Sequence, residues 1–222
     1  MSVSNESIQF MLGKWQTLPV YSLESFGAYL GNEKDRVLLP IKQVGPDTRV
    51  GDRLKVFLYR DSDDRLIATV HTPKITIGEV AALKVRQVSP IGAFLDWGLE
   101  KDLFLPFRQQ TEKVEEGMYY PVALYVDKSE RLAATMWIDK HISGADLDEK
   151  RKKKAMLKLQ ADAENVYTRI SRRGGHLPYN DKADPEVIER DFHLSKNAFK
   201  RAVGVLYKAR RLDITEDGIT LV

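Results

Sequence analysis

The sequence contains no cysteine among its 222 residues. This absence excludes disulfides, thiolate zinc sites, iron–sulfur clusters held by cysteine, and cysteine nucleophiles. There is also no apolar run close to the roughly 20 residues that a membrane-spanning helix needs. Residues 1–12 lack the basic start and long apolar stretch of a secretory signal. We therefore expect a cytoplasmic protein without a membrane partner.

Signatures of catalysis are scarce as well. The four histidines, at positions 71, 141, 176 and 193, stand apart without the spacing that would hold a metal ion. There is no glycine-rich phosphate loop ending in Lys-Ser or Lys-Thr, and no Gly-Xaa-Ser-Xaa-Gly nucleophile elbow. The sequence therefore predicts a protein that is not an enzyme and that holds neither a metal ion nor a cofactor.

What the sequence does contain is an internal repeat. Residues 27–30 (Gly-Ala-Tyr-Leu) recur as residues 92–95 (Gly-Ala-Phe-Leu), about 65 positions later. The match continues to residues 65–69 and 131–135, which share the pattern Arg-Leu-Xaa-Ala-Thr. Because these identities follow one nearly constant offset, the chain carries two copies of one domain.

Each copy has the pattern of several short strands. In the second copy, turn residues separate the apolar segments, which are residues 79–88, 92–97, 103–107, 121–126 and 131–138. Five strands in about 65 residues are too short for a wide sandwich, whereas a small closed barrel of the oligonucleotide-binding (OB) type leaves no free edge. We therefore predict a mainly β N-terminal part with two tandem five-stranded OB-type barrels, at residues 1–74 and 75–142.

The C-terminal third has a different composition. Residues 143–222 carry a net charge of +4, whereas residues 1–74 and 75–142 carry +1 and −2. The shift begins at Ser143-Gly144 and includes the basic run at residues 150–154. We expect residues 143–155 to form a solvated basic linker, with electrostatic assistance to RNA binding as the alternative.

Residues 156–222 have the pattern of three helices followed by a hairpin. A helical spacing of apolar residues stops at Gly174-Gly175. Asp184 and Ser195 are the expected N-caps of the second and third helices. Residues 212–214 and 219–221 flank a turn and form the hairpin. This order predicts an α+β winged-helix domain.

Several segments resemble a known family. Residues 78–106, with Leu-Asp-Trp-Gly-Leu-Glu-Lys-Asp-Leu at 95–103, resemble the ribosomal S-one (S1) RNA-binding domain, as does the hairpin at 127–132. Together with the ending at residues 206–221, nearly the whole chain resembles the conserved virulence factor B family. The resemblance implies a bacterial RNA-binding regulator built from S1-type barrels followed by a winged helix. Fuller members have three barrels, whereas this sequence shows two.

The resemblance also implies which aromatic residues bind RNA. In S1 domains, the aromatic residue before the first glycine of the repeat and the one two residues after that glycine lie on the binding face. Phe26 and Tyr29 fill these positions in the first copy. Phe94 fills one of them in the second copy, where Ile91 takes the other. Stacking on such rings contributes roughly 1–3 kcal/mol per base.

The alternative is that these aromatic side chains fill the barrels, which is the more frequent place for an aromatic residue in a strand. Alternation along the strand puts Ala28 and Leu30 on one face and Tyr29 on the other, and this favours binding. The aromatic residues that we expect to pack inside the protein are Trp15, Trp97 and Trp137.

The S1 hairpin contributes an aspartate and an arginine. They correspond to Asp61 and Arg65 in the first copy and to Asp127 and Arg131 in the second, where each arginine can reach a phosphate or a base edge. The alternative is that the aspartates only shape their turns. The histidine on the third strand of the S1 pattern is replaced by leucine, at positions 39 and 105.

The third helix of a winged helix presents its polar face to nucleic acid. The residues on that face are Lys196, Asn197, Lys200, Arg201 and Lys208. The alternative is a solvated face on a module that contacts protein.

From these features we predict a non-enzymatic protein that binds single-stranded RNA by stacking and basic contacts and that regulates gene expression. Two alternatives are a scaffold that docks on proteins of the ribosome or polymerase, and a protein that binds duplex DNA through the winged helix alone.

Overall fold

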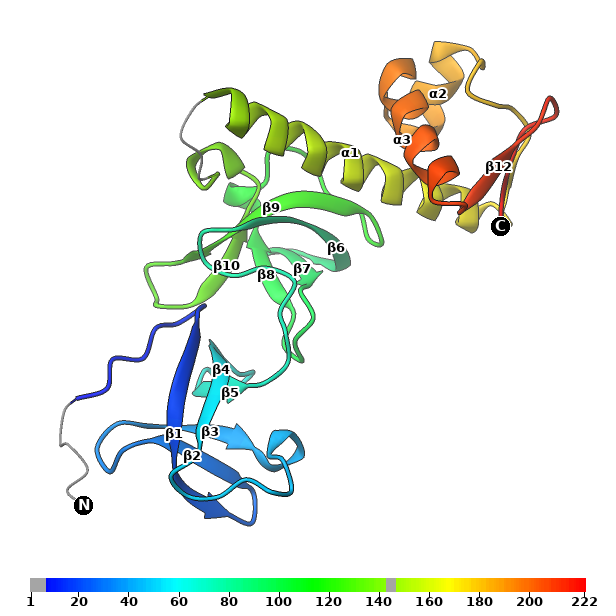
Figure 1. The fold of residues 1–222 in the computed structure, drawn as a ribbon. Coiled ribbons are helices and arrows are strands. Elements are labelled where there is room, and N and C mark those ends of the chain that lie inside the picture. Colours follow the sequence, from blue (N-terminus) through cyan, green and yellow to red (C-terminus); the bar gives the residue numbers. More distant parts are fainter. Residues whose placement is uncertain (1–6, 143–146) are drawn as a thin grey trace.

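The computed structural model describes residues 7–142 and 147–222. Figure 1 shows three parts in chain order: a barrel at the N-terminal end, a second curled sheet in the centre, and a helical domain at the far end. No helix in the described ranges is long and apolar enough to span a membrane.

The first part is a closed five-stranded barrel with the strand order β1-β2-β3-β5-β4. The barrel closes through a parallel pair in which Leu38 lies beside Ile67. The strands are β1 (Trp15–Glu24), β2 (Gly27–Gly31), β3 (Arg36–Pro40), β4 (Arg53–Arg60) and β5 (Leu66–Thr69), with a 3-10 helix η1 (Ile41–Gln43) after β3.

The second part repeats this arrangement as a five-stranded sheet with the order β10-β9-β6-β7-β8. Its end strands do not pair as a ladder, and the seam between them is bridged by Gln109, which accepts a hydrogen bond from Thr135 Oγ1 at 2.7 Å. The elements are β6 (Val80–Ser89), β7 (Gly92–Asp96), β8 (Leu103–Pro106), η2 (Phe107–Gln109), β9 (Tyr119–Val126), β10 (Leu132–Thr135) and η3 (Ile138–Lys140). The prediction of two S1-type, five-stranded β units is confirmed.

The glycine that opens β2 and β7 explains part of the repeated sequence. Gly27 and Gly92 have φ angles of +158° and +153°. A Cβ at Gly27 would lie 2.2 Å from the carbonyl oxygen of Leu39, and one at Gly92 would lie 2.5 Å from that of Leu105. Only glycine lets the second strand approach the third this closely.

The two barrels are joined by a shared apolar core. Phe57 and Tyr59, from β4 of the first barrel, belong to the same buried cluster as the core of the second. Both rings pack edge-on against Trp97, which is 2% exposed, with centroid distances of 5.9 and 6.1 Å. We call this contact the joint. It fixes the barrels against each other because Trp97 is enclosed by side chains from both.

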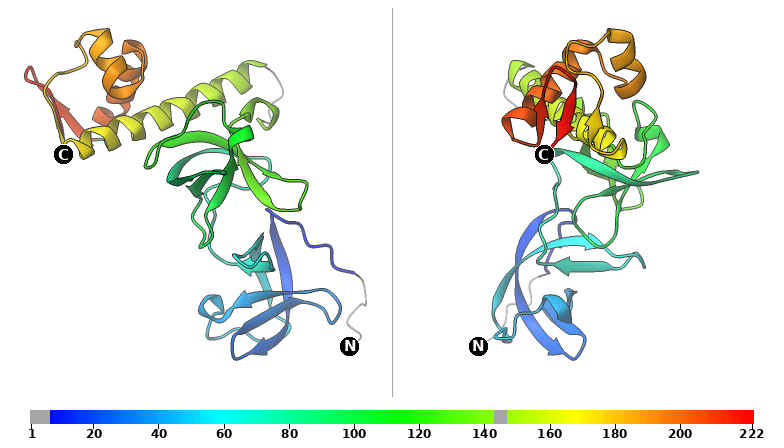
Figure 2. Two further views of the ribbon diagram at one scale, coloured as in Figure 1. Left: turned by 180° about the vertical axis from the view of Figure 1, so that it is seen from behind. Right: turned by 90° about the vertical axis from the view of Figure 1, so that its right-hand side faces the viewer.

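A 26-residue helix, α1 (Leu147–Arg172), follows the second barrel. It lies across that barrel and extends beyond it to carry the C-terminal domain (Figure 2). Its middle buries Leu157 and Ala161, and its C-terminal part contributes Val166 and Ile170 to the C-terminal core. One helix therefore serves as the support for both domains.

The start of α1 differs from the expectation of a basic linker at residues 143–155. Residues 147–155 are helical, while residues 143–146 lie outside the described residues. Lysine and arginine are good helix formers, and Asp148 and Glu149 suit the positive end of the helix dipole. The basic run 150–154 is therefore an exposed helical surface and not an extended connection.

The C-terminal domain has the predicted order of helices and hairpin. Asp184 caps the second helix by accepting a hydrogen bond from Glu186 N, and Ser195 caps the third by accepting one from Ala198 N. The elements after α1 are β11 (His176–Leu177), α2 (Pro185–Phe192), α3 (Lys196–Lys208), β12 (Leu212–Ile214) and β13 (Ile219–Leu221). The winged-helix prediction is confirmed.

Candidate nucleic-acid interface

The first barrel has an exposed apolar patch over β2 and β3. Phe26 is 52% exposed, and its ring meets Tyr29 edge-on at a centroid distance of 6.1 Å. Tyr29 lies directly opposite Leu38 in the strand ladder, and the Phe26 carbonyl accepts a hydrogen bond from Ile41 N. The guanidinium of Arg36 lies 4.9 Å from the centre of the Tyr29 ring. We call Phe26, Tyr29, Leu38 and Ile41 the first patch.

The second barrel has the equivalent patch, with a different distribution of rings. Phe94 pairs with Phe104 across β7 and β8, and their ring centroids are 5.4 Å apart. Ile91 is 65% exposed, and Phe107 is also exposed. We call Ile91, Phe94, Phe104 and Phe107 the second patch. Sequence reasoning missed Phe104 and Phe107, although both lie at the repeat offset from Leu38 and Ile41.

Alternation along β2 has the predicted effect. Ala28 and Leu30 are completely buried, whereas Tyr29 is only partly covered. The leucines that replace the S1 histidine, Leu39 and Leu105, are core residues with no exposed surface. Leucine at these positions strengthens the barrel cores and adds no polar group to either patch.

The hairpin residues of the first barrel bond to each other. Arg65 donates to Asp61 Oδ2 from Nε and Nη2, at 2.9 and 2.8 Å, and also contacts Asp63 at 2.8 Å. Burial opposes ionisation of Asp61, but the hydrogen bonds from Arg65 prevail and lower the pKa of its carboxyl. Asp61 therefore shapes its turn, and the charge of Arg65 is shared with two carboxylates.

The hairpin of the second barrel reaches across the joint. Asp127 Oδ1 accepts hydrogen bonds from the backbone N–H groups of Ser129 and Arg131. The Arg131 side chain instead donates to Asp64 Oδ2 of the first barrel, at 3.1 and 2.9 Å. This hydrogen bond lowers the pKa of Asp64. Nearby, Lys101 Nζ donates to the carbonyl of Asp61 at 2.6 Å.

The three tryptophans differ in burial. Trp97 is buried in the joint, and Trp15 packs against Phe57 at a centroid distance of 5.8 Å. The expectation that Trp137 packs inside is wrong, because Trp137 is 53% exposed. Its Nε1 donates a hydrogen bond to the carbonyl of Arg108, and its backbone N–H donates one to Thr135 Oγ1. It lies two residues after β10, and the residue between them, Met136, is the one that is buried.

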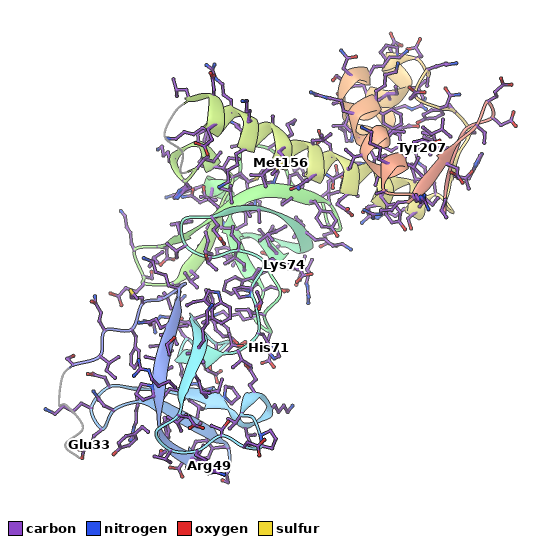
Figure 3. All side chains as sticks on the ribbon, viewed as in Figure 1. Glu33, Arg49, His71, Lys74, Met156 and Tyr207 are labelled. Carbon is purple, nitrogen blue, oxygen red and sulfur yellow. The ribbon has the colours of Figure 1, made fainter. Side chains whose placement is uncertain are left out.

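The outward face of α3 carries the predicted polar residues. Asn197, Arg201 and Lys208 are exposed and have no hydrogen-bond or ion-pair partner among the described residues. Lys196 Nζ donates to the carbonyl of Lys182 at 3.0 Å, and Lys200 lies 3.6 Å from Asp181. Tyr207 projects from the same helix, and Met156 projects from α1 (Figure 3).

In the part of the chain that the structure describes, no group of three or more histidine, aspartate or glutamate side chains could hold a metal ion.

Two family models match this chain. The S1 domain matches residues 12–71 and again residues 77–137, and the CvfB-like winged helix domain matches residues 164–221. The chain belongs to the conserved virulence factor B family. The matched domains are nucleic-acid-binding domains of a class that is typically non-enzymatic. Nucleic-acid binding is therefore the general activity of this family member.

Relatives of this chain align with it over most of their length. The uncharacterized protein YitL of Bacillus subtilis is 25% identical, and the alignment covers 88% of this chain and 89% of that protein. Conserved virulence factor B of Staphylococcus saprophyticus is 23% identical, with 95% and 94% covered. That alignment has 282 positions for 95% of a 222-residue chain, so about 70 positions of the relative face a gap. This length agrees with one additional barrel in the relative.

A solved structure supports the fold of this virulence factor B relative. It is a multidomain protein with nucleic acid binding domains from Streptococcus pneumoniae, with a TM-score of 0.51 and 18% identity. The similarity covers 95% of this chain and 98% of that one.

Proposed function

We propose that this protein is a regulator of gene expression that binds single-stranded RNA along its two barrels, without catalysing a reaction. The observation that carries the proposal is the pair of equivalent patches, because both S1 domains present apolar side chains at the same positions of the repeat, with a ring at Tyr29 in one and at Phe94 in the other. Contiguous exposed apolar surface is unusual on a protein and indicates a binding site.

Stacking is the main source of affinity in this proposal. Bases of a single strand are free to stack on exposed rings, and each stacked base contributes roughly 1–3 kcal/mol. Phe26, Tyr29 and Phe94 are the rings predicted from the sequence, and Phe104 extends the platform on the second barrel. Because every base has a π-face, this mode of binding tolerates many sequences.

Cations beside the patches would neutralise phosphates. Arg36 is exposed above the Tyr29 ring and has no carboxylate partner among the described residues. Arg65 and Arg131 are more than half exposed at the side chain but are already paired with carboxylates. In the proposal these two arginines contribute less than Arg36, and Asp127 positions Arg131 through its turn.

The winged helix would extend the contact with nucleic acid. Lys196, Asn197, Lys200 and Arg201 lie on one side of α3, and the basic run of α1 adds positive charge. Cations on a helix attract phosphates without reading sequence.

The test is a titration of labelled oligouridylate at several salt concentrations. Each phosphate neutralised adds roughly 0.7 to the slope of log affinity against log salt. The double variant Phe26→Ala/Phe94→Ala is expected to lose at least about tenfold in affinity. Met156→Ala, an exposed apolar residue on α1, is the matched control and keeps the affinity. A flat salt slope, or wild-type affinity in the double variant, contradicts the proposal.

A second candidate is duplex DNA binding through α3, which the unpaired Asn197, Arg201 and Lys208 favour. It predicts that Arg201→Gln/Lys208→Gln abolishes duplex binding and that the Phe26→Ala/Phe94→Ala variant retains it. The scaffold alternative, docking on ribosomal or polymerase proteins, predicts weak oligouridylate binding by the isolated chain together with co-purification of a protein partner.

A further inference from the structure

A pocket of about 390 Å³ lies where the second barrel, α1 and the winged helix meet. Its walls come from β9, from the middle of α1 and from the turn between α2 and α3. We call it the junction pocket. The lining residues that concern binding are Trp137, Lys154, Lys158, Asp162, Arg169 and His193.

Asp162 is the most unusual residue of this pocket. It is 8% exposed, and no described side chain or backbone N–H donates a hydrogen bond to its carboxylate. Burial raises the pKa of Asp162, and the charges of Lys158 and Arg201 oppose that shift only in part. Its oxygens are not among the described side-chain atoms that are fully buried without a partner, so solvent reaches them from the pocket. A carboxylate that lines a pocket without a partner is therefore placed to accept hydrogen bonds from a ligand.

Arg169 does not offer a free donor to the pocket. Its Nη2 donates to both carboxylate oxygens of Glu115, at 3.0 and 3.1 Å. Its Nε is fully buried without a hydrogen-bond partner among the described residues, so neither solvent nor a ligand reaches it. Recognition of a ligand in this pocket therefore depends on the carboxylate of Asp162.

The rim supplies two further elements. Trp137 exposes half of its indole at the edge of the pocket. Lys158 is exposed and has no ion-pair partner within hydrogen-bond distance among the described residues, whereas Lys154 bonds to Asp139 at 2.7 Å. An aromatic face suits a base, and a free ammonium suits a phosphate.

We propose that the junction pocket binds a guanosine 5′-phosphate unit, with the base edge on Asp162, the base against Trp137 and the phosphate near Lys158. The unit is either a free nucleotide or a guanosine of an RNA strand. Only the second case rests on the proposed function of the barrels.

Guanine fits these groups better than the other bases. Its Watson–Crick edge has two adjacent N–H donors, N1–H and the 2-amino group, which match the two oxygens of one carboxylate. Adenine, cytosine and uracil each offer only one N–H donor group on that edge, so a carboxylate that needs two donors discriminates against them.

Calorimetric titration of the full chain with each of the four nucleoside monophosphates tests the pocket. GMP is expected to bind at least about tenfold more tightly than AMP, CMP or UMP. Asp162→Asn, which keeps the shape of the side chain, removes this preference. Asp148→Asn on the exposed start of α1 is the matched control and keeps it. Trp137→Leu changes only the exposed rim of the pocket, so it is expected to leave the fold intact and to lower the affinity for GMP.

Two oligonucleotides then distinguish the source of the guanosine. If the unit belongs to RNA, a heptauridylate with one central guanosine binds more tightly than heptauridylate itself, and Asp162→Asn removes the gain. If the unit is a free nucleotide, GMP binds while the central guanosine adds nothing. Equal affinity for the four monophosphates together with no gain from the central guanosine overturns the proposal, as does a guanine preference that survives in Asp162→Asn. Heptauridylate contains no guanine, so its affinity reports on the barrel patches independently of the junction pocket.

Discussion

The two barrels share one sequence template and one strand order, yet they occupy different environments. The first barrel has a single neighbour and its own separate core. The second barrel is held on one side by the joint and on the other by α1, and its core includes Phe57 and Tyr59 from the first barrel. The two copies of the domain therefore have different places in the molecule. The second copy is the central support, and the first is a terminal unit.

The first and second patches also differ, both in their residues and in the charges around them. The first patch is flanked by a free cation, Arg36, and its exposed ring, Phe26, lies at the tip of the β1–β2 turn. The second patch has aliphatic Ile91 at that tip and the Phe94–Phe104 pair below it. The second barrel also carries a net charge of −2 against +1 for the first. We infer that the first barrel makes the stronger contact with phosphates and that the second relies on ring surface.

The largest expected effect comes from breaking the joint. Trp97→Ala removes a buried indole that packs on two rings of the other barrel, and we expect a loss of about 3–5 kcal/mol in the free energy of unfolding. Urea or thermal denaturation measures this loss. Because the cavity opens between the barrels, the variant is also expected to unfold in two resolved steps, with the first barrel separating from the rest.

Trp137→Ala is the matched control for this experiment. The residue is exposed, so its removal is expected to change stability by less than about 0.5 kcal/mol. Equal losses in the two tryptophan variants would show that the joint does not hold the barrels together.

The second prediction exchanges the tips of the two patches. Phe26→Ala removes a stacking ring and is expected to weaken oligouridylate binding by about 1–3 kcal/mol, whereas Ile91→Ala weakens it less. The converse variant, Ile91→Phe, gives the second patch the ring of the first and raises affinity. Fluorescence anisotropy measures all three. If Ile91→Phe binds no better than the natural chain, the second patch does not take part in stacking.

Much of this architecture could be predicted from the sequence because local signals and the global fold agree. The Gly-Ala-Tyr-Leu and Gly-Ala-Phe-Leu segments both begin with a glycine, Gly27 or Gly92. Glycine is required there because the second strand of each barrel approaches the third so closely. Asp184 and Ser195 could be recognised as caps because an N-cap depends on the local chain alone. Alternation around Tyr29 gave the correct outward face for the same reason.

The features that the sequence did not reveal all depend on contacts between distant segments. The partner of Arg131 is Asp64, 67 positions away, and no local pattern links the two. Tyr59 has the strand spacing of any core residue, so its place in the core of the other barrel could not be inferred. The junction pocket joins three elements, and Asp162 is one of many acidic residues on a strongly charged helix. Phe104 is the exception, since extending the repeat alignment to the outward positions of the third strand would have found it.

The smallest expected effect concerns the ionic contact beside the joint. The hydrogen bond from Arg131 keeps the pKa of Asp64 below its unfolded value, which is about 3.9. Ionised Asp64 therefore stabilises the folded chain above that pH, and the contribution is lost as the pH falls through the folded pKa. Asp64→Asn lacks the contribution at every pH. The urea midpoints of the natural chain and of Asp64→Asn are thus expected to differ at pH 6 and to converge toward pH 3.

Asp47→Asn, an exposed aspartate with no described side-chain contact, is the control, and its midpoint is expected to follow that of the natural chain. A constant difference between the natural chain and Asp64→Asn across the pH range would mean that Arg131 holds the barrels by packing alone. The two hairpins would then differ in how their side chains pack and not in how their charges pair.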